Sequence, residues 1–153
     1  MEPTMERTYV YTFNSPLGEY TAQAYFLRCY DDRFWKAFKH FVRDQNFSRI
    51  DQEVVAGGAK VLSSPEKDGD RDFILRDIEK SVHLHHTSRA MLFTHHDCGA
   101  YGGLAKFSGD KDAELMFHQG EHKKAQEIVR ERFPELDVET YFIDEKGVIK
   151  TST

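Results

Sequence analysis

The sequence predicts a single α/β domain with a mainly parallel sheet of about four to five strands flanked by helices. Short runs of β-branched and aromatic residues alternate with longer segments whose apolar residues repeat at helical spacing. Strands that alternate with helices are typical of parallel sheets with right-handed crossovers. The length of 153 residues fits one domain, placed at 1–153, and no internal repeat or domain boundary interrupts it.

Residues 1–22 are expected to form an N-terminal arm or a hairpin ahead of a core that spans 23–150. β-forming residues fill 8–13, and the turn-forming segment 14–18 follows them directly. The short apolar run at 24–27 then predicts the first buried strand of the core.

The rest of the core continues the alternation of strands and helices. Phe34, Phe38 and Phe41 share one face of the first predicted helix. Gly57 ends the second strand, and Pro134 ends the last helix. In chain order we expect a helix at 34–42, a strand at 53–56, a helix that begins at Asp70 or Asp72, a strand at 89–94, a helix at 112–133, a strand at 138–143, and a turn at Gly147 into a short tail.

Composition and charge exclude several classes of protein. The formal net charge of −5 argues against general nucleic-acid binding, which needs a basic surface. No apolar run approaches the ~20 residues of a membrane span, so no membrane association is expected. The N-terminal sequence lacks the basic-then-apolar pattern of a secretory signal, and the expected location is the cytoplasm.

Both cysteines lie just past the C-terminal end of a predicted strand. Cys29 follows the first strand and Cys98 follows the third, and ligand sites in open α/β sheets form at that edge. His95 precedes Cys98 by three positions. Two thiolates and one imidazole suit zinc and leave a fourth position free, as in catalytic sites. On spacing alone, two buried thiols remain an equal alternative.

The residues beside the cysteines form a two-part motif. The segment 29–33 reads C-x-D-x-R, and the segment 95–99 reads H-x-x-C-G. In this order and at strand ends, the pair resembles the signature of the β-class carbonic anhydrases. The segment 55–59 also resembles the Ala-Gly segment that follows the second strand in that family, and 138–147 resembles its last core strand and turn. We therefore interpret the chain as a small, divergent member.

The resemblance implies a carbonic anhydrase, a zinc lyase that converts CO2 reversibly to bicarbonate. It assigns one zinc ion per chain to Cys29, His95 and Cys98. It also makes Asp31 and Arg33 a catalytic dyad. In this dyad Arg33 keeps Asp31 ionised, and Asp31 orients a zinc-bound hydroxide toward CO2.

Further expectations follow from the same resemblance. The backbone at Gly99 is expected to approach the substrate, since glycine permits close approach. His96 is the nearest imidazole that could carry the product proton to solvent. The expected partners are the small-molecule substrate, CO2 or bicarbonate, and further copies of the chain in a homodimer or higher even homo-oligomer.

Departures from the family leave two alternatives open. Val54 and Val55 stand where many members have Arg-Asn, and no residue matches a pocket glutamine of the plant-type enzymes. Hydrolysis of COS or CS2 on the same scaffold is one alternative, and a non-catalytic zinc-binding regulatory protein is the other. His118 and His122 lie at i and i+4, and we interpret them as a solvated or loop-proximal pair rather than a second metal site.

Overall fold

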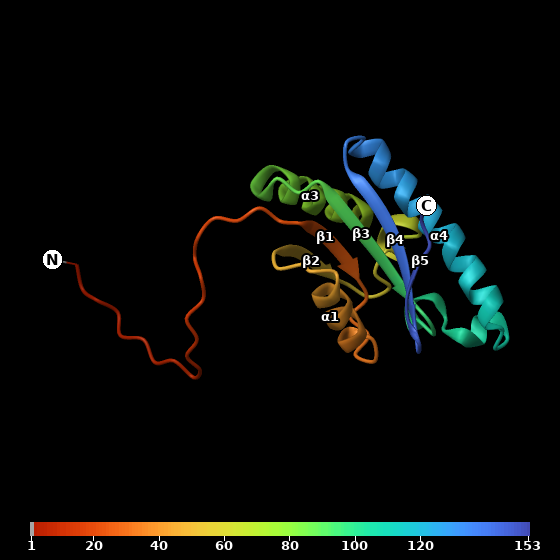
Figure 1. The fold of residues 1–153 in the computed structure, drawn as a ribbon, viewed down its shortest axis with the longest axis horizontal. Helices are drawn as coiled ribbons and strands as arrows, with labels where there is room; N and C mark the ends of the chain where they lie inside the picture. The colour runs from red at the N-terminus through yellow and green to blue at the C-terminus, as the bar shows by residue number, and fades with distance from the viewer. Residues whose placement is uncertain (1) are drawn as a thin grey trace.

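The computed structural model describes residues 2–153 as a five-stranded sheet with helices on both faces (Figure 1). The strand order is β2-β1-β3-β4-β5. The first four strands in this order are parallel, whereas β5 runs antiparallel to β4. The strands are β1 (Ala24–Arg28), β2 (Ile50–Val54), β3 (Arg89–His95), β4 (Asp137–Asp144) and β5 (Gly147–Lys150). The helices are α1 (Trp35–Asp44), α2 (Lys60–Ser63), α3 (Asp68–His85) and α4 (Lys111–Arg132), with short 3-10 turns η1 (Gly99–Tyr101) and η2 (Leu104–Phe107).

Two apolar cores lie on the two faces of the sheet. Successive side chains of a strand point to opposite faces. Leu27 therefore packs with residues of α2, α3 and α4, whereas Phe26 packs with Phe38 of α1. Burying a large apolar side chain contributes roughly 1.5–3 kcal/mol. The central strands β1 and β3, which feed both cores, thus form a rigid support for the loops at their carboxyl ends.

The predicted fold class is confirmed, and the differences lie at the ends of elements. β2 begins at Ile50 rather than at residue 53, because polar residues are tolerated on this edge strand, none of whose five residues is fully buried. α3 begins at Asp68, ahead of the predicted cap at Asp70 or Asp72, and both Asp68 and Asp70 lie in its first turn. Carboxylates there stabilise the positive end of a helix.

The predicted tail after Gly147 is instead a strand. β5 pairs with the end of β4, from Gly147 opposite Asp144 to Lys150 opposite Tyr141. The side chain of Asp144 accepts the backbone N–H groups of Lys146 and Gly147, which closes the hairpin turn. One side of the sheet therefore ends in an antiparallel hairpin.

Residues 2–19 form an arm that extends away from the sheet and contains neither helix nor strand (Figure 1). The hairpin expected as one possibility does not form in this segment. Its apolar side chains, among them Tyr9 and Val10, are exposed. Met1, the first residue of the expected arm, lies outside the described residues. No helix within residues 2–153 is long and apolar enough to cross a bilayer.

Candidate metal centre

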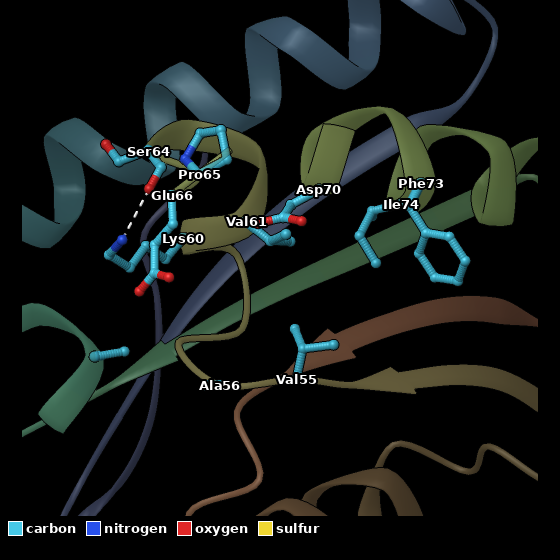
Figure 2. A pocket seen from close by; sticks show the side chains of 11 residues that line it. Val55, Ala56, Lys60, Val61, Ser64, Pro65, Glu66, Asp70, Phe73 and Ile74 are labelled. Carbon is cyan, nitrogen blue, oxygen red and sulfur yellow. Dashed lines mark hydrogen bonds between the residues drawn. The ribbon is translucent and has the colours of Figure 1, made fainter. Parts of the chain in front are cut away.

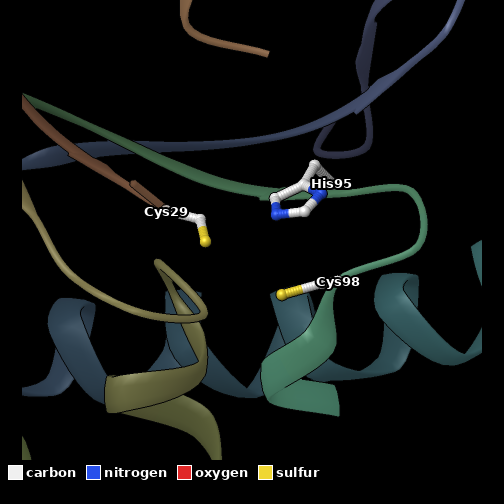
Figure 3. A group of neighbouring side chains, drawn as sticks. All are labelled: Cys29, His95 and Cys98. Atoms are coloured by element: carbon white, nitrogen blue, oxygen red, sulfur yellow. The ribbon is translucent and has the colours of Figure 1, made fainter. Parts of the chain in front are cut away.

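Three potential metal ligands converge at the carboxyl edge of the sheet (Figure 3). Cys29 directly follows β1, His95 is the last residue of β3, and Cys98 lies three residues further on. Their ligand atoms all lie within 4.8 Å of one another. His95 and Cys98 are buried, and Cys29 is half-buried. Within residues 2–153, these three side chains form the one group of at least three histidine, cysteine or acidic residues arranged to hold a metal ion.

The segment after β2 closes around Cys29. Gly57 donates its backbone N–H to Cys29 Sγ at 3.3 Å. Gly58 has a φ of +55°, and a Cβ at this position would lie 2.9 Å from the backbone nitrogen of Cys29. Glycine alone fits this combination of left-handed backbone and close approach. The Gly57–Gly58 pair therefore positions a hydrogen-bond donor against the first thiol.

The two thiols differ in acidity. A hydrogen bond from Cys98, together with one from the Gly57 N–H, lowers the pKa of Cys29 to about 4 against the opposing effect of burial. The adjacent Cys29 sulfur and burial raise the pKa of Cys98. Cys29 is thus poised as a thiolate. The Cys98 thiol would release its proton on binding a metal, because metals bind the thiolate form.

His95 offers an unprotonated ring nitrogen to these thiols. Its Nδ1 lies 2.7 Å from the carbonyl oxygen of His96, which can only accept, so Nδ1 carries the ring proton. Nε2 of the neutral ring is then bare, and it is buried without a hydrogen-bond partner. Leaving such an atom unpaired costs about 1–3 kcal/mol. A zinc ion would satisfy Nε2, and the set of two sulfurs and one nitrogen fits this metal.

Asp31 and Arg33 form an ion pair beside the three ligands. Arg33 Nε lies 3.0 Å from Asp31 Oδ1, and Nη2 lies 2.7 Å from Oδ2. Hydrogen bonds from the Arg33 side chain, reinforced by its backbone N–H, lower the pKa of the Asp31 carboxyl to about 2 despite some desolvation. Asp31 Oδ2 also lies 3.7 Å from His95 Nε2. An ionised carboxylate is thus held next to the bare ring nitrogen.

Two further acidic residues surround the same loop and were not predicted from the sequence. Asp97 accepts Arg33 Nη1 at 3.0 Å, and its carbonyl accepts Nη2 of the same arginine at 3.0 Å. Glu114 of α4 is buried and accepts both His96 Nδ1 at 2.6 Å and the Asp97 N–H at 2.8 Å. Asp97 lies inside the motif, which is a usable signal. Glu114 lies far along the chain in a charged helix, and no spacing marks it.

The interpretation of His118 and His122 as a solvated pair is wrong. Both side chains are fully buried, because this face of α4 packs on the sheet. Thr94 Oγ1 lies 2.7 Å from His118 Nδ1 and 2.6 Å from His122 Nε2, and His122 Nδ1 lies 2.6 Å from Thr151 Oγ1. Burial lowers the pKa of His118 to about 3 and that of His122 to about 4. Both imidazoles are therefore neutral parts of a buried polar network.

Two hollows adjoin this edge of the sheet. A cavity of about 10 Å³ lies against Cys29 and His95, and its other lining is largely apolar. The larger hollow, about 310 Å³, lies between α2, α3 and the end of β2 (Figure 2). It reaches the loop after β3 (residues 96–100, called the ligand loop) at Ala100, but none of the three candidate ligands lines it. Gly99 is exposed, and a Cβ there would meet no atom within 4 Å, so space is open above its backbone.

Fold and site together define an α/β protein with the architecture of β-carbonic anhydrases and a Cys-His-Cys ligand group. Residues 20–153 match the family model described as "Putative carbonic anhydrase", and the chain belongs to this family. The resemblance inferred from the paired motif is thereby confirmed.

Solved structures of low sequence identity share this fold. The β-carbonic anhydrase isoform I of Trichomonas vaginalis has a TM-score of 0.59 at 13% identity, over 92% of this chain and 87% of that one. Tetrameric β-carbonic anhydrase from Sordaria macrospora has a TM-score of 0.60 at 14% identity, over 88% and 82%. The apo form of a carbon disulfide hydrolase gives 0.55 at 16% identity, over 88% and 81%. At these identities the likeness establishes the fold.

Relatives at higher identity match a shorter stretch. Uncharacterized proteins from Rickettsia conorii and Rickettsia bellii are 32% and 33% identical over 75 residues, which is 48% of this chain. The match spans 40% and 46% of the length of these relatives, less than half of either.

Proposed function

We propose that the chain is a zinc-dependent carbonic anhydrase that interconverts CO2 and bicarbonate at Cys29, His95 and Cys98. The observation that carries this proposal is the bare, buried Nε2 of His95 facing two thiols, with the ionised Asp31 3.7 Å away. A purely structural zinc site would fill its fourth position with another protein ligand. A zinc ion held here would supply Lewis acidity, which lowers the pKa of a coordinated water toward neutrality.

Asp31 and Arg33 are the proposed catalytic dyad. Asp31 accepts a hydrogen bond from the attacking oxygen nucleophile and so points its lone pair at the carbon of CO2. Arg33 keeps Asp31 ionised and fixed, because a bidentate guanidinium–carboxylate pair restricts both side chains. The same guanidinium reaches Asp97, which ties the dyad to the ligand loop.

The substrate and the proton have separate proposed routes. The open space above Gly99 lets a small molecule approach the centre along the backbone. His96 takes up the product proton, because its ring is partly exposed and Nε2 lies 4.0 Å from the surface carboxylate of Glu145. Both assignments rest on geometry around the three ligands.

Assembly into an even homo-oligomer is part of the proposal. The related Sordaria macrospora enzymes are tetrameric. The exposed apolar residues of the arm, such as Val10 and Leu17, also favour contact with another copy. The cytoplasmic location stays a prediction.

The deciding experiment is stopped-flow CO2 hydration by the zinc-loaded chain from mildly acidic to mildly alkaline pH. The rate is expected to rise with pH through the neutral range and to fall about 10²–10³-fold in Asp31→Ala. Asp32→Ala is the matched control, because Asp32 is the exposed neighbour of Asp31 and should leave the rate unchanged. A chain with one zinc per protomer and no rate above buffer would refute the proposal.

CS2 or COS hydrolysis is the second candidate function. The cavity beside Cys29 and His95 is small and lined by Phe34, Phe38 and Phe93 among others. Such a lining accepts an apolar linear molecule better than a hydrated anion. Release of hydrogen sulfide from CS2 or COS, with no hydration of CO2 by the same zinc-loaded sample, would favour this candidate. Zinc bound without either activity would indicate a non-catalytic zinc-binding protein.

A further inference from the structure

One peptide group connects a buried carboxylate to the ligand His95. The N–H of this group belongs to Asp97 and donates to Glu114 Oε2 at 2.8 Å. The carbonyl of the same group belongs to His96 and accepts from His95 Nδ1 at 2.7 Å. Glu114 thus lies two hydrogen bonds from the imidazole, on the side opposite to Nε2.

We propose that Glu114 is a positioning residue of the metal centre. It orients His95 and strengthens its metal binding through the His96–Asp97 peptide group, and it anchors the turn that delivers Cys98. The inference deepens the proposed function and rests on its metal site, though not on the reaction that the site performs.

Glu114 acts on His95 by polarising the peptide group between them. A carboxylate that accepts from a peptide N–H polarises the peptide, so its carbonyl oxygen becomes a stronger acceptor. That oxygen holds the Nδ1 proton of His95. Partners of this kind fix the tautomer and ring orientation of a ligating histidine and raise its basicity. The charge of Glu114 therefore makes Nε2 a better electron donor to a metal.

Glu114 also holds the backbone of the ligand loop at Asp97. Asp97 has a φ of +55°, a left-handed conformation that costs free energy in a residue other than glycine. Glu114 holds its N–H, Arg33 holds its carbonyl, and the Leu104 N–H donates to its Oδ1 at 2.8 Å. The next residue is Cys98. Loss of the Glu114 contact would release one side of the turn that places the second sulfur.

Glu114 is itself buried against the ligand loop. Its side chain is 1% exposed, and its two oxygens are taken by His96 Nδ1 and the Asp97 N–H. A buried carboxylate is costly unless hydrogen bonds compensate for the lost water. Both compensating donors belong to the ligand loop. Glu114 also lies near the N-terminus of α4, where the helix dipole favours negative charge. The loop and the carboxylate thus stabilise each other.

The test is zinc affinity of the full chain, measured by competition with a chromophoric chelator, in the wild type and in Glu114→Gln. The substitution keeps the shape and removes the charge. Outer partners of metal ligands typically contribute about 10–100-fold in affinity, and a loss of that size is expected. In Co²⁺-substituted protein, the visible bands from cobalt and its thiolates should also shift, a readout that a purely structural role would not move.

The matched control is Glu121→Gln on the same helix. Glu121 accepts three hydrogen bonds, from Ser63, Ser64 and Tyr101, and it reaches a candidate ligand only through the whole of Tyr101, whose N–H donates to the Cys98 carbonyl at 3.0 Å. Its variant should unfold at lower temperature while keeping wild-type zinc affinity and cobalt spectrum. An equal loss of affinity in both variants, or an unchanged affinity and spectrum in Glu114→Gln, would overturn the inference.

A second variant covers the case in which Glu114→Gln does not fold. Glu114→Asp keeps the charge but withdraws it by one methylene, and a loss of zinc affinity of about tenfold is expected. Wild-type affinity in this variant would overturn the inference. A zinc-binding wild type without CO2 hydration would refute the proposed activity alone, because the affinity measurements do not depend on catalysis.

Discussion

Thr94 and His95 are neighbours on β3, and their side chains lie on opposite faces of the sheet. His95 belongs to the candidate metal centre on one face, whereas Thr94 contacts two buried histidines on the other. On one face Nε2 of His95 has no partner and faces two sulfurs within 4.8 Å. On the other face, Thr94 joins His118 and His122 in a closed network. His118 Nε2 is also buried without a partner, but within residues 2–153 it belongs to no group of convergent ligands.

The comparison shows what distinguishes a ligand histidine from a structural one. Two histidines at i and i+4 on a helix look like a metal pair by spacing, yet here they bond a threonine and belong to no group of three convergent ligands among residues 2–153. His95 gains its chemistry from two strand ends that meet at one edge of the sheet. Convergence of donor atoms from separate elements, rather than proximity in sequence, makes the site.

The largest expected effect is a loss of folding stability in acid, which arises from the buried network of Thr94, His118 and His122. His118 and His122 have folded pKa values of about 3 and about 4, below the ~6.5 of the unfolded chain. Between the folded and unfolded pKa values the unfolded state binds more protons than the folded state. The contribution of the two histidines to stability is therefore fully present above pH ~6.5 and is lost as the pH falls. Each histidine costs up to about 1.4 kcal/mol per pH unit, roughly 5 kcal/mol for the pair by pH ~4.5.

Urea unfolding of the zinc-free chain at several pH values measures this loss. His118→Gln should flatten the pH profile in addition to lowering stability at neutral pH. His83→Gln serves as the control, because His83 is exposed and should leave the slope intact. A profile equally steep in His118→Gln would contradict the assignment.

Removal of the ligand should abolish the other site. His95→Ala is expected to lower zinc affinity by more than the ~10–100-fold typical of an outer partner, because a direct ligand is lost. The zinc-free chain should also lose some stability, because the substitution removes a buried ring and its Nδ1 hydrogen bond to the His96 carbonyl. Metal content by mass spectrometry after dialysis measures the effect, with His83→Ala as control. One zinc per chain retained in His95→Ala would show that the metal lies elsewhere.

Thr94→Val should separate the two faces. The substitution removes the hydroxyl that bonds both imidazoles and leaves two buried ring nitrogens unpaired, at a cost of about 1–3 kcal/mol each. Zinc affinity should stay within about twofold, because the side chain of His95 makes no hydrogen bond to this network. Thr151→Val removes a partly exposed member and should cost less. A parallel loss of zinc affinity in Thr94→Val would show that the faces are coupled.

The smallest effect is expected from Arg33→Lys. The positive charge stays, but the two-pronged contact with Asp31 is lost, and Arg and Lys are not equivalent at such a site. The CO2 hydration rate should fall about tenfold, with zinc content unchanged. Lys36→Arg provides a control at an exposed position of the next helix. A rate equal to that of wild type would remove Arg33 from the dyad.

Local pattern predicted most of the fold and the convergence of Cys29, His95 and Cys98 into a group that could hold a metal. The apolar runs of β1 and β3 place Cys29 and His95 at the same edge because parallel strands share their carboxyl ends. β5 was not predicted, because the segment from Gly147 to Lys150 forms a strand through its pairing with β4, which no local pattern shows. Glu114 escaped because its role depends on the docking of α4 against the ligand loop, which no local pattern encodes.

The two sides of the sheet also differ in how they end, and this affects how copies of the chain can meet. β2 and β5 are the two edge strands of the described sheet, and each has a strand partner on one side alone, β1 and β4 respectively. Within its five residues β2 carries Asp51 and Glu53. Two such edges brought together would set carboxylates against each other and gain few hydrogen bonds, so sheet extension through β2 is disfavoured. Contacts between copies of the chain are therefore not expected to run through the edge of β2.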